Sequence, residues 1–199
     1  MAPITSMSDS EGRATLGACQ AIAPERAEAD ERLRGCVRAH LATVWRVLRR
    51  NGVPAADVDD AVQKVFLVLS RKAHGVESGR ELPFLLRTAV FVASEARRTQ
   101  CRRRESNEPS FDERSSDRPN PEHELLERER LSQLDGLLNA MDDPLRVAFV
   151  LYEIEELTIA AIAEILDVPL GTVASRLRRA RARFEELAGV FRVAGGGQR

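Results

Sequence analysis

Residues 157–183, LTIAAIAEILDVPLGTVASRLRRARAR, hold two short apolar-periodic segments separated by a tight break. In the first segment, Ile162 and Ile165 follow Thr158 at helical spacing, and threonine suits the N-cap of a helix. Asp-Val-Pro at 167–169 then interrupts the pattern, because proline fits an α-helix only in its first turn. The stretch therefore predicts a helix-turn-helix, a motif whose second helix enters the major groove of DNA.

The second segment has two faces when it is projected at about 100° per residue. The apolar face, which we expect to pack on the first helix, consists of Val173, Leu177, Ala180 and Phe184. The opposite face, which we expect to meet the groove, consists of Thr172, Ser175, Arg176, Arg179 and Arg183, with Arg178 and Arg181 beside it for phosphates. Arginine can read guanine or bridge phosphates with two hydrogen bonds, and no carboxylate offsets the five arginines here. This imbalance favours a polyanion partner over a merely solvated helix.

The amino-acid composition limits the class of protein but does not identify its binding partner. The chain has 199 residues, of which 43% are hydrophobic and 31% charged, a length that permits one or two globular domains. The net charge of -1 conceals basic clusters at 97–104 and 172–183 that acids elsewhere offset. Overall charge therefore does not exclude nucleic acid as a partner.

The reactive residue types are scattered. The cysteines and histidines, which form no CxxC pair or other ligand spacing, are Cys19, Cys36, Cys101, His40, His74 and His123. We therefore expect no disulfide framework, metal, cofactor or catalytic site, and no enzyme activity. No run approaches the roughly 18 apolar residues of a membrane span, so we expect a cytoplasmic protein without membrane insertion.

The pattern along the chain predicts an all-α fold with two small helical domains. Residues 1–28 lack periodicity and are expected to form a disordered arm. The first domain, 29–104, has three expected helices. The first ends at Asn51-Gly52, and its apolar stripe consists of Leu33, Val37, Leu41, Val44 and Leu48. The second helix begins at Asp57, and the third begins near Pro83. Residues 105–121 are rich in proline, serine and charge, which predicts a flexible linker. The second domain, 122–190, adds two helices before the helix-turn-helix, one of which begins at Asp143-Pro144, and 191–199 form a tail.

Two separate stretches resemble the sigma-70 family of bacterial RNA polymerase sigma factors, in its small extracytoplasmic-function (ECF) form. DVDDAVQKVFLVLSRK, 57–72, is similar to the region 2 helix of the family, and residues 157–187 are similar to its region 4 helix-turn-helix. Many regulators share the outline of region 4, but both motifs in this order, joined by a linker, are more specific. Several positions depart from the family pattern; among them, Lys64 stands where an acid is usual, and Phe91 where asparagine is common.

The resemblance implies promoter recognition without catalysis. Region 2 would bind core RNA polymerase through Asp57, Asp60, Gln63, Lys64 and Phe66. The third helix and the loop before it, 74–81, would capture the melted -10 element, through Phe84, Arg87, Glu95, Arg97 and Arg98. Region 4 would read the -35 element through Thr172, Ser175, Arg176, Arg178, Arg179 and Arg183. The implied partners are core RNA polymerase, promoter DNA and an anti-sigma factor.

Two alternatives remain open at this stage. A stand-alone helix-turn-helix regulator, whose N-terminal helices bind a dimer partner or a ligand, would need no polymerase. A dimer on a palindromic site would favour this alternative. A sigma-like decoy would occupy polymerase or an inhibitor without initiating transcription, an alternative that the departures at Lys64 and Phe91 keep open.

Overall fold

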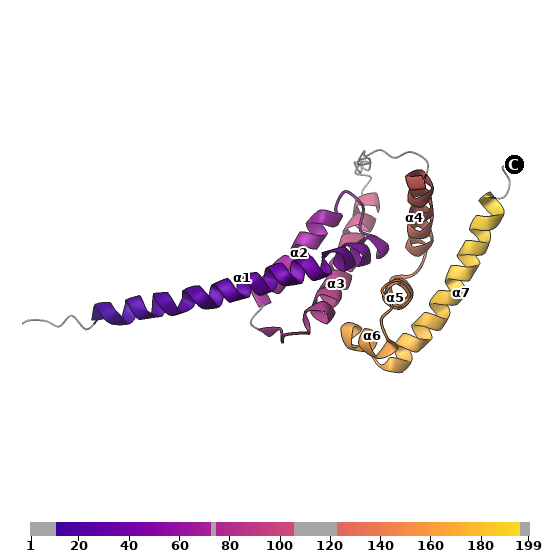
Figure 1. Ribbon diagram of the computed structural model, residues 1–199. Helices are drawn as coiled ribbons and strands as arrows, with labels where there is room; N and C mark the ends of the chain where they lie inside the picture. Colours follow the sequence, from indigo (N-terminus) through magenta and orange to yellow (C-terminus); the bar gives the residue numbers. More distant parts are fainter. Residues whose placement is uncertain (1–10, 73–74, 106–122, 196–199) are drawn as a thin grey trace, which may run out of the picture. The chain divides into compact units, whose positions relative to one another are not determined.

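The computed structural model describes residues 11–72, 75–105 and 123–195, and all regular structure within these ranges is helical (Figure 1). In chain order the elements are α1 (Glu11–Arg50), α2 (Val58–Lys72), α3 (Glu81–Glu105), α4 (His123–Asn139), α5 (Asp143–Phe149), the π-helical turn η2 (Val150–Ile154), α6 (Ile159–Leu166) and α7 (Leu170–Gly195). The expected all-α fold is confirmed. No helix in these ranges combines the length and apolar character needed to cross a membrane. By packing, the chain divides into two compact units, residues 1–39 and 40–199.

The first unit contains the N-terminal part of α1. This helix begins at Glu11, so residues 11–28 are helical where the sequence predicted a loose arm. Extending an existing helix needs no new nucleation step, and α1 continues through this stretch although Pro24 has no backbone N–H to donate. On its exposed surface, Glu31 accepts a hydrogen bond from Arg38 at 2.8 Å and pairs with Arg34 at 3.4 Å. The hydrogen bond from Arg38 is the main cause that lowers the pKa of Glu31.

Helix α1 ends at Asn51-Gly52, as the sequence predicted, and the turn there is a Schellman motif. The backbone N–H of Val53 donates to the carbonyl of Leu48 at 3.1 Å, and that of Gly52 donates to the carbonyl of Arg49 at 3.0 Å. Gly52 has a φ of 91°, a conformation that favours glycine. A Cβ there would also lie 2.8 Å from the guanidinium of Arg97, so glycine lets α3 approach this turn closely.

A hydrophobic core lies among the buried residues of α1, α2 and α3. Val44, Val47 and Leu48 are fully buried on α1, and α2 and α3 pack on each other. The buried residues of these two helices are Val58, Ala61, Val62, Val65, Phe66, Leu69, Leu85, Leu86, Ala89, Val92 and Ala93. The expected stripe on α1 was wrong at Leu41, which is 45% exposed, and it missed Val47. Side chains three or four residues apart share a helix face, so the spacing alone could not fix which edge of the stripe is covered.

A second core cluster joins α4, α5, η2 and α7. Its buried members are Leu138, Met141, Phe149, Val150 and Ala180. As predicted, α5 begins at Asp143 with Pro144 in its first turn, where no amide N–H is needed.

The predicted division into domains at 104 and 122 stays a prediction. Residues 106–121 of the predicted linker and residues 196–199 of the predicted tail lie outside the described residues, and α7 continues past 190 to Gly195.

Candidate nucleic-acid interface

The helix-turn-helix predicted from residues 157–183 is present as α6 and α7. Thr158 caps α6: its Oγ1 accepts a hydrogen bond from the N–H of Ala161 at 3.2 Å. At the other end, Asp167 adopts a left-handed conformation with a φ of 55°, and the N–H of Val168 donates to the carbonyl of Ala163 at 3.0 Å. The carbonyl of Pro169 then accepts the N–H of Thr172 at 2.9 Å, within the first turn of α7. The break therefore lies at the residues the sequence indicated.

The apolar face of α7 holds this helix in place. Val173, Leu177 and Ala180 are buried, and α7 packs on α6 and on α5. Phe184 stacks on Phe149 of α5, with ring centroids 4.8 Å apart and an interplanar angle of 22°. This packing fixes the orientation of α7, because the four apolar positions occupy a single side of the helix.

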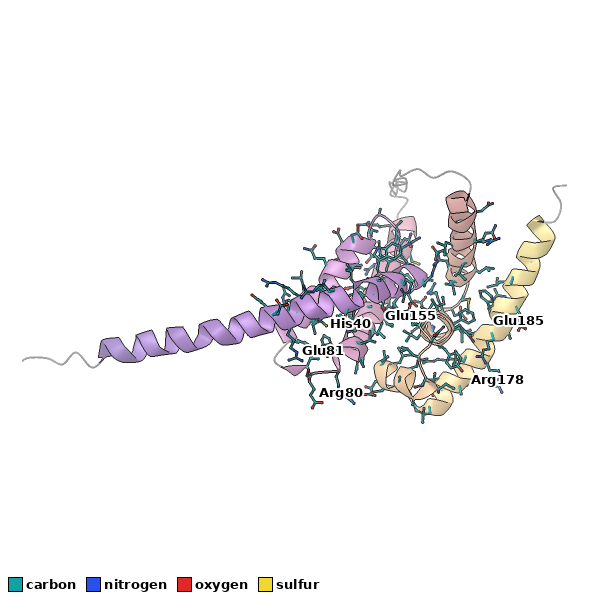
Figure 2. The ribbon with its side chains drawn as sticks, in the orientation of Figure 1. His40, Arg80, Glu81, Glu155, Arg178 and Glu185 are labelled. Carbon is teal, nitrogen blue, oxygen red and sulfur yellow. The ribbon has the colours of Figure 1, made fainter. Side chains whose placement is uncertain are left out.

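The opposite face of α7 carries the predicted -35 residues. Arg178, Arg179 and Arg183 are exposed, and the part-buried positions of the set are Thr172, Ser175 and Arg176. Figure 2 shows Arg178 and Glu185 along this helix. Arg183 pairs with Glu186 at 2.8 Å, one turn later on the same helix. The chemistry available on this face is guanidinium groups with short hydroxyl side chains, which suits phosphates and guanine edges.

Arg181, which the sequence placed beside this face for phosphates, has internal partners. Its Nε donates to Oε1 of Glu153 in η2 at 2.6 Å, and its guanidinium lies 5.1 Å from the ring centroid of Tyr152. The hydrogen bond to Glu153 is the main cause that raises the pKa of Arg181. Arg181 therefore joins α7 to η2.

Helix α3 brings four of the five predicted -10 residues to one side. At about 100° per residue, positions 84, 87, 95 and 98 fall within an arc of about 80°, together with position 91. Phe91 is 67% exposed, an unusual exposure for a large aromatic side chain. Arg97 points elsewhere: its Nε lies 3.0 Å from Oδ1 of Asp143. The loop before α3 is described from residue 75 onward, so His74 lies outside the described residues.

Helix α2 and the residue before it expose four of the five predicted polymerase-binding residues, namely Asp57, Asp60, Gln63 and Lys64. Phe66 is different, because it is only 9% exposed and belongs to the core beneath this surface. A direct contact of Phe66 with a partner would require that core to open, so its position favours a structural role. The exposed set combines two carboxylates, one amide and one ammonium group at the start of a helix.

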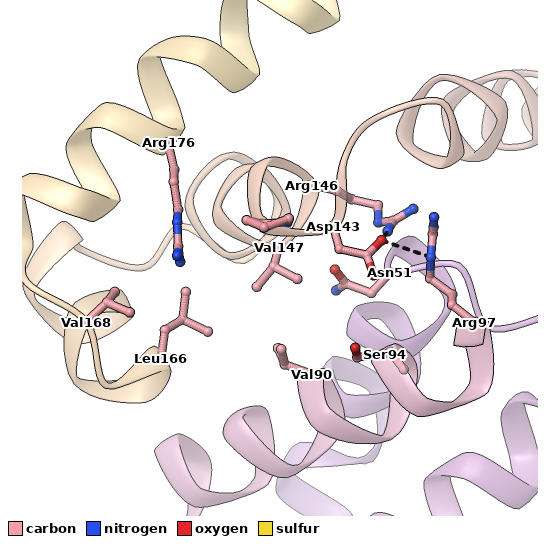
Figure 3. Close-up of a pocket in the computed structure, with 12 residues that line it drawn as sticks. Asn51, Val90, Ser94, Arg97, Asp143, Arg146, Val147, Leu166, Val168 and Arg176 are labelled. Carbon is pink, nitrogen blue, oxygen red and sulfur yellow. Dashed lines mark hydrogen bonds and ion pairs between the residues drawn. The ribbon is translucent and has the colours of Figure 1, made fainter. Parts of the chain in front are cut away.

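The sequence did not indicate that the polar side chains of Asn51 and Arg146 are buried. They line a cavity of about 270 Å³ to which α3, α5 and α7 contribute (Figure 3). Arg146 is 1% exposed; it donates to the carbonyl of Leu138 at 3.3 Å and forms an ion pair with Asp143. Arg176 reaches into the same cavity from α7. The one available signal for Arg146 was its position one turn after Asp143 at a helix start, which surface ion pairs also show.

Comparisons with known proteins all match this chain to sigma factors. The family model described as "Sigma-70, region 4" matches residues 131–184. The chain is 31% identical over 138 residues to the ECF RNA polymerase sigma-E factor of Escherichia coli, which covers 65% of this chain and 72% of that relative. It is 30% identical over 152 residues to the ECF RNA polymerase sigma factor SigE of Mycolicibacterium smegmatis, covering 75% of this chain and 59% of that relative.

Two solved structures share the fold. CnrH, in complex with the cytosolic domain of CnrY, gives a TM-score of 0.63 at 21% identity, covering 82% of this chain and 94% of CnrH. The sigma factor RpoE of Bartonella quintana, in complex with the anti-sigma factor NepR, gives a TM-score of 0.62 at 21% identity, covering 77% of this chain and 94% of RpoE.

Proposed function

The chain belongs to the ECF RNA polymerase sigma factors of the sigma-70 family, and on that premise we propose that it binds core RNA polymerase and directs it to a restricted set of promoters. The observation that carries this proposal is the pairing of two surfaces in one chain. One is the arginine face of α7 on a helix-turn-helix, and the other is the exposed polar surface at the start of α2. A stand-alone regulator would need the first surface but would have no use for the second.

We assign the two DNA-facing surfaces to different forms of the promoter. The face of α7 that includes Arg178 and Arg179 would read a duplex -35 element, because the major groove displays a distinct pattern for each base pair. The face of α3 that includes Arg87, Phe91 and Arg98 would meet the melted -10 strand. Unpaired bases stack on aromatic rings, and arginines follow the backbone. The exposure of Phe91 supports this second assignment.

We assign polymerase binding to the exposed residues of α2, with Asp60 at the centre. Its carboxylate is exposed and lies on the same side of the helix as Asp57 and Lys64. The same carboxylates also favour the positive end of the α2 dipole, so binding and helix stabilisation are compatible roles. We further propose that the protein works in the cytoplasm without catalytic activity, and that an anti-sigma factor controls it, by analogy with RpoE of Bartonella quintana and its bound anti-sigma factor NepR.

The variant Asp60→Arg tests the polymerase assignment, because it places a positive charge on the proposed docking surface. We expect the wild-type chain to co-elute with bacterial core RNA polymerase in size-exclusion chromatography, and the variant to elute alone. A charge reversal at the centre of an interface commonly costs several kcal/mol, which corresponds to a loss of 100-fold or more in affinity at about 2.7 kcal/mol or above.

The matched control is Glu185→Arg, the same reversal of a carboxylate on the exposed surface of α7 (Figure 2). We expect this control to co-elute with polymerase as the wild type does. Equal co-elution of Asp60→Arg and the control would remove α2 as the docking surface. A wild-type chain that elutes alone would count against the proposed function itself.

A further inference from the structure

The cavity shown in Figure 3 combines a polar end, an apolar middle and a free guanidinium group. Its volume is about 270 Å³, close to the lower limit of about 300 Å³ for pockets that hold small molecules. All the residues that line it belong to the unit of residues 40–199, and they come from α3, α5, α6, α7 and the turns beside these helices. The cavity is therefore large enough for a small organic ligand.

The polar end of the cavity contains two buried atoms that have no hydrogen-bond partner within the described part of the chain. They are Oδ1 of Asn51, a residue that is 2% exposed, and Nε of Arg146, a residue that is 1% exposed. Figure 3 shows the amide of Asn51 directed toward the space between Val90 and Val147. Burial of such atoms is unfavourable unless a bound group satisfies them, so this end favours a ligand group that forms hydrogen bonds.

The middle of the cavity is lined by aliphatic side chains. Val90 of α3, Val147 of α5 and Leu166 of α6 come together here from three separate helices (Figure 3). These side chains favour an apolar ligand body, because contact with them removes the apolar surface of the ligand from water. An inorganic ion alone would gain nothing from this part of the cavity.

Arg176 brings the free guanidinium group. Its side chain is part-buried and extends from α7 toward Leu166, and it has no hydrogen-bond or ion-pair partner among the residues that the structure describes (Figure 3). Arg97 and Arg146 differ, because they share the carboxylate of Asp143. A carboxylate matches a single guanidinium in charge and in geometry, since two parallel hydrogen bonds join them. A phosphate with up to two charges would need further donors, so Arg176 favours a carboxylate.

We propose that this cavity binds a small organic carboxylate that has an apolar body and a hydroxyl group at its far end. The carboxylate pairs with Arg176, the body lies among the aliphatic side chains, and the hydroxyl group meets the polar end at Asn51. A hydroxyl group suits that end because it can donate to an oxygen such as Oδ1 of Asn51 and can accept from an N–H such as Nε of Arg146. Ligand binding requires neither DNA nor polymerase, so it does not rest on the proposed function.

Methyl NMR of the full chain, with isotope-labelled valine and leucine, tests the site without DNA or polymerase. The probe is p-hydroxyphenylpropanoate, which carries a carboxylate, an aromatic body and a distal hydroxyl group. We expect it to shift the methyl resonances of Val90, Val147 and Leu166, with a dissociation constant of about 0.1–1 mM for a ligand of this size. Leu131, exposed on α4, is the internal control and should not shift. Unchanged resonances of the three cavity residues at about 10 mM probe would overturn the proposal.

Related probes test which chemical groups the cavity recognises. The amide p-hydroxyphenylpropanamide has nearly the same shape without the charge, and we expect it to bind about tenfold or more weakly. Phenylpropanoate lacks the hydroxyl group and should bind about three- to tenfold more weakly. Inorganic phosphate, an anion without an apolar body, should leave the cavity resonances unchanged. Equal affinities for the acid and the amide would contradict the choice of a carboxylate, and equal affinities with and without the hydroxyl group would contradict the role of the polar end.

Arg176→Gln tests the guanidinium directly. The matched control is Arg179→Gln, because Arg179 lies on the exposed side of the same helix and is not among the residues that line this cavity. We expect Arg176→Gln to bind the acid about tenfold or more weakly than the wild type does, and to bind the amide with unchanged affinity. The unchanged amide affinity shows that the cavity is intact and separates loss of the charge from misfolding. Equal affinities of the two variants for the acid would contradict the role of Arg176.

Arg176 also belongs to the predicted -35 set, so the ligand and duplex DNA would compete for one guanidinium group, a consequence that rests on the proposed function. We expect the acid, at about ten times its dissociation constant, to weaken binding of the upstream duplex of a promoter that the protein uses by up to about tenfold. The amide at the same concentration should have a smaller effect. Unchanged DNA affinity would contradict the competition but not the methyl shifts. Failure of the wild type to co-elute with polymerase would contradict the proposed function alone.

Discussion

Phe149→Ala lowers the free energy of unfolding by about 3–5 kcal/mol, the largest effect that we expect from a single change. Phe149 is 8% exposed and its ring stacks on Phe184 of α7. Its removal leaves a cavity at the point where α5 holds α7, in a cluster that also contains Leu138 and Val150. We therefore expect duplex DNA binding to weaken together with stability, because the orientation of α7 depends on this contact.

Urea unfolding followed by circular dichroism measures this effect, and Leu131→Ala is the matched control. Leu131 is a large apolar side chain on α4, but it is 48% exposed, so its truncation should cost less than about 1 kcal/mol. A loss below about 1 kcal/mol for Phe149→Ala would contradict the packing described for this cluster.

Arg179→Ala lowers the affinity for duplex -35 DNA by about 1–3 kcal/mol if the side chain reads a base pair, a loss of about 5- to 150-fold. Arg179 is exposed on the arginine face of α7, opposite the buried Leu177 and Ala180. Fluorescence anisotropy on the upstream duplex of a promoter that the protein uses, with each base pair substituted in turn, gives the position of the loss. Reduced discrimination at one or two base pairs supports base reading.

The control for this experiment is Arg181→Ala, the same change two residues later. Arg181 is paired with Glu153 and lies over Tyr152, so we expect it to affect stability more than DNA discrimination. If Arg179→Ala weakens all sequences alike and reduces the salt dependence by about one counterion, the side chain contacts phosphate only. That result would remove Arg179 from the base-reading set.

The helix-turn-helix could be predicted from the sequence because its signals are local. Thr158 caps α6, Pro169 ends the break and the apolar spacing of α7 is regular, and each of these works within one or two turns of helix. The end of α1 at Asn51-Gly52 was predictable for the same reason.

What could not be predicted depends on contacts between residues distant in sequence. Leu41 fits the apolar spacing of α1 as well as Val47 does, yet Val47 is fully buried and Leu41 is 45% exposed. Phe66 fits the motif of the helix that we propose binds polymerase, but it lies in the core. The hydrogen-bond partners of Arg97 and Arg146 could not be predicted either. An arginine in a sequence does not indicate whether a carboxylate, a carbonyl or DNA will accept its hydrogen bonds.

The most direct test of the central claim is transcription in vitro from fragmented bacterial genomic DNA, with core RNA polymerase in the presence and absence of the full chain. Sequencing the 5′ ends of the transcripts locates the start sites. We predict a small set of start sites that depend on the chain, each preceded by two shared sequence elements at a fixed spacing. Transcripts identical to those of core polymerase alone would contradict the claim that this protein directs promoter-specific initiation.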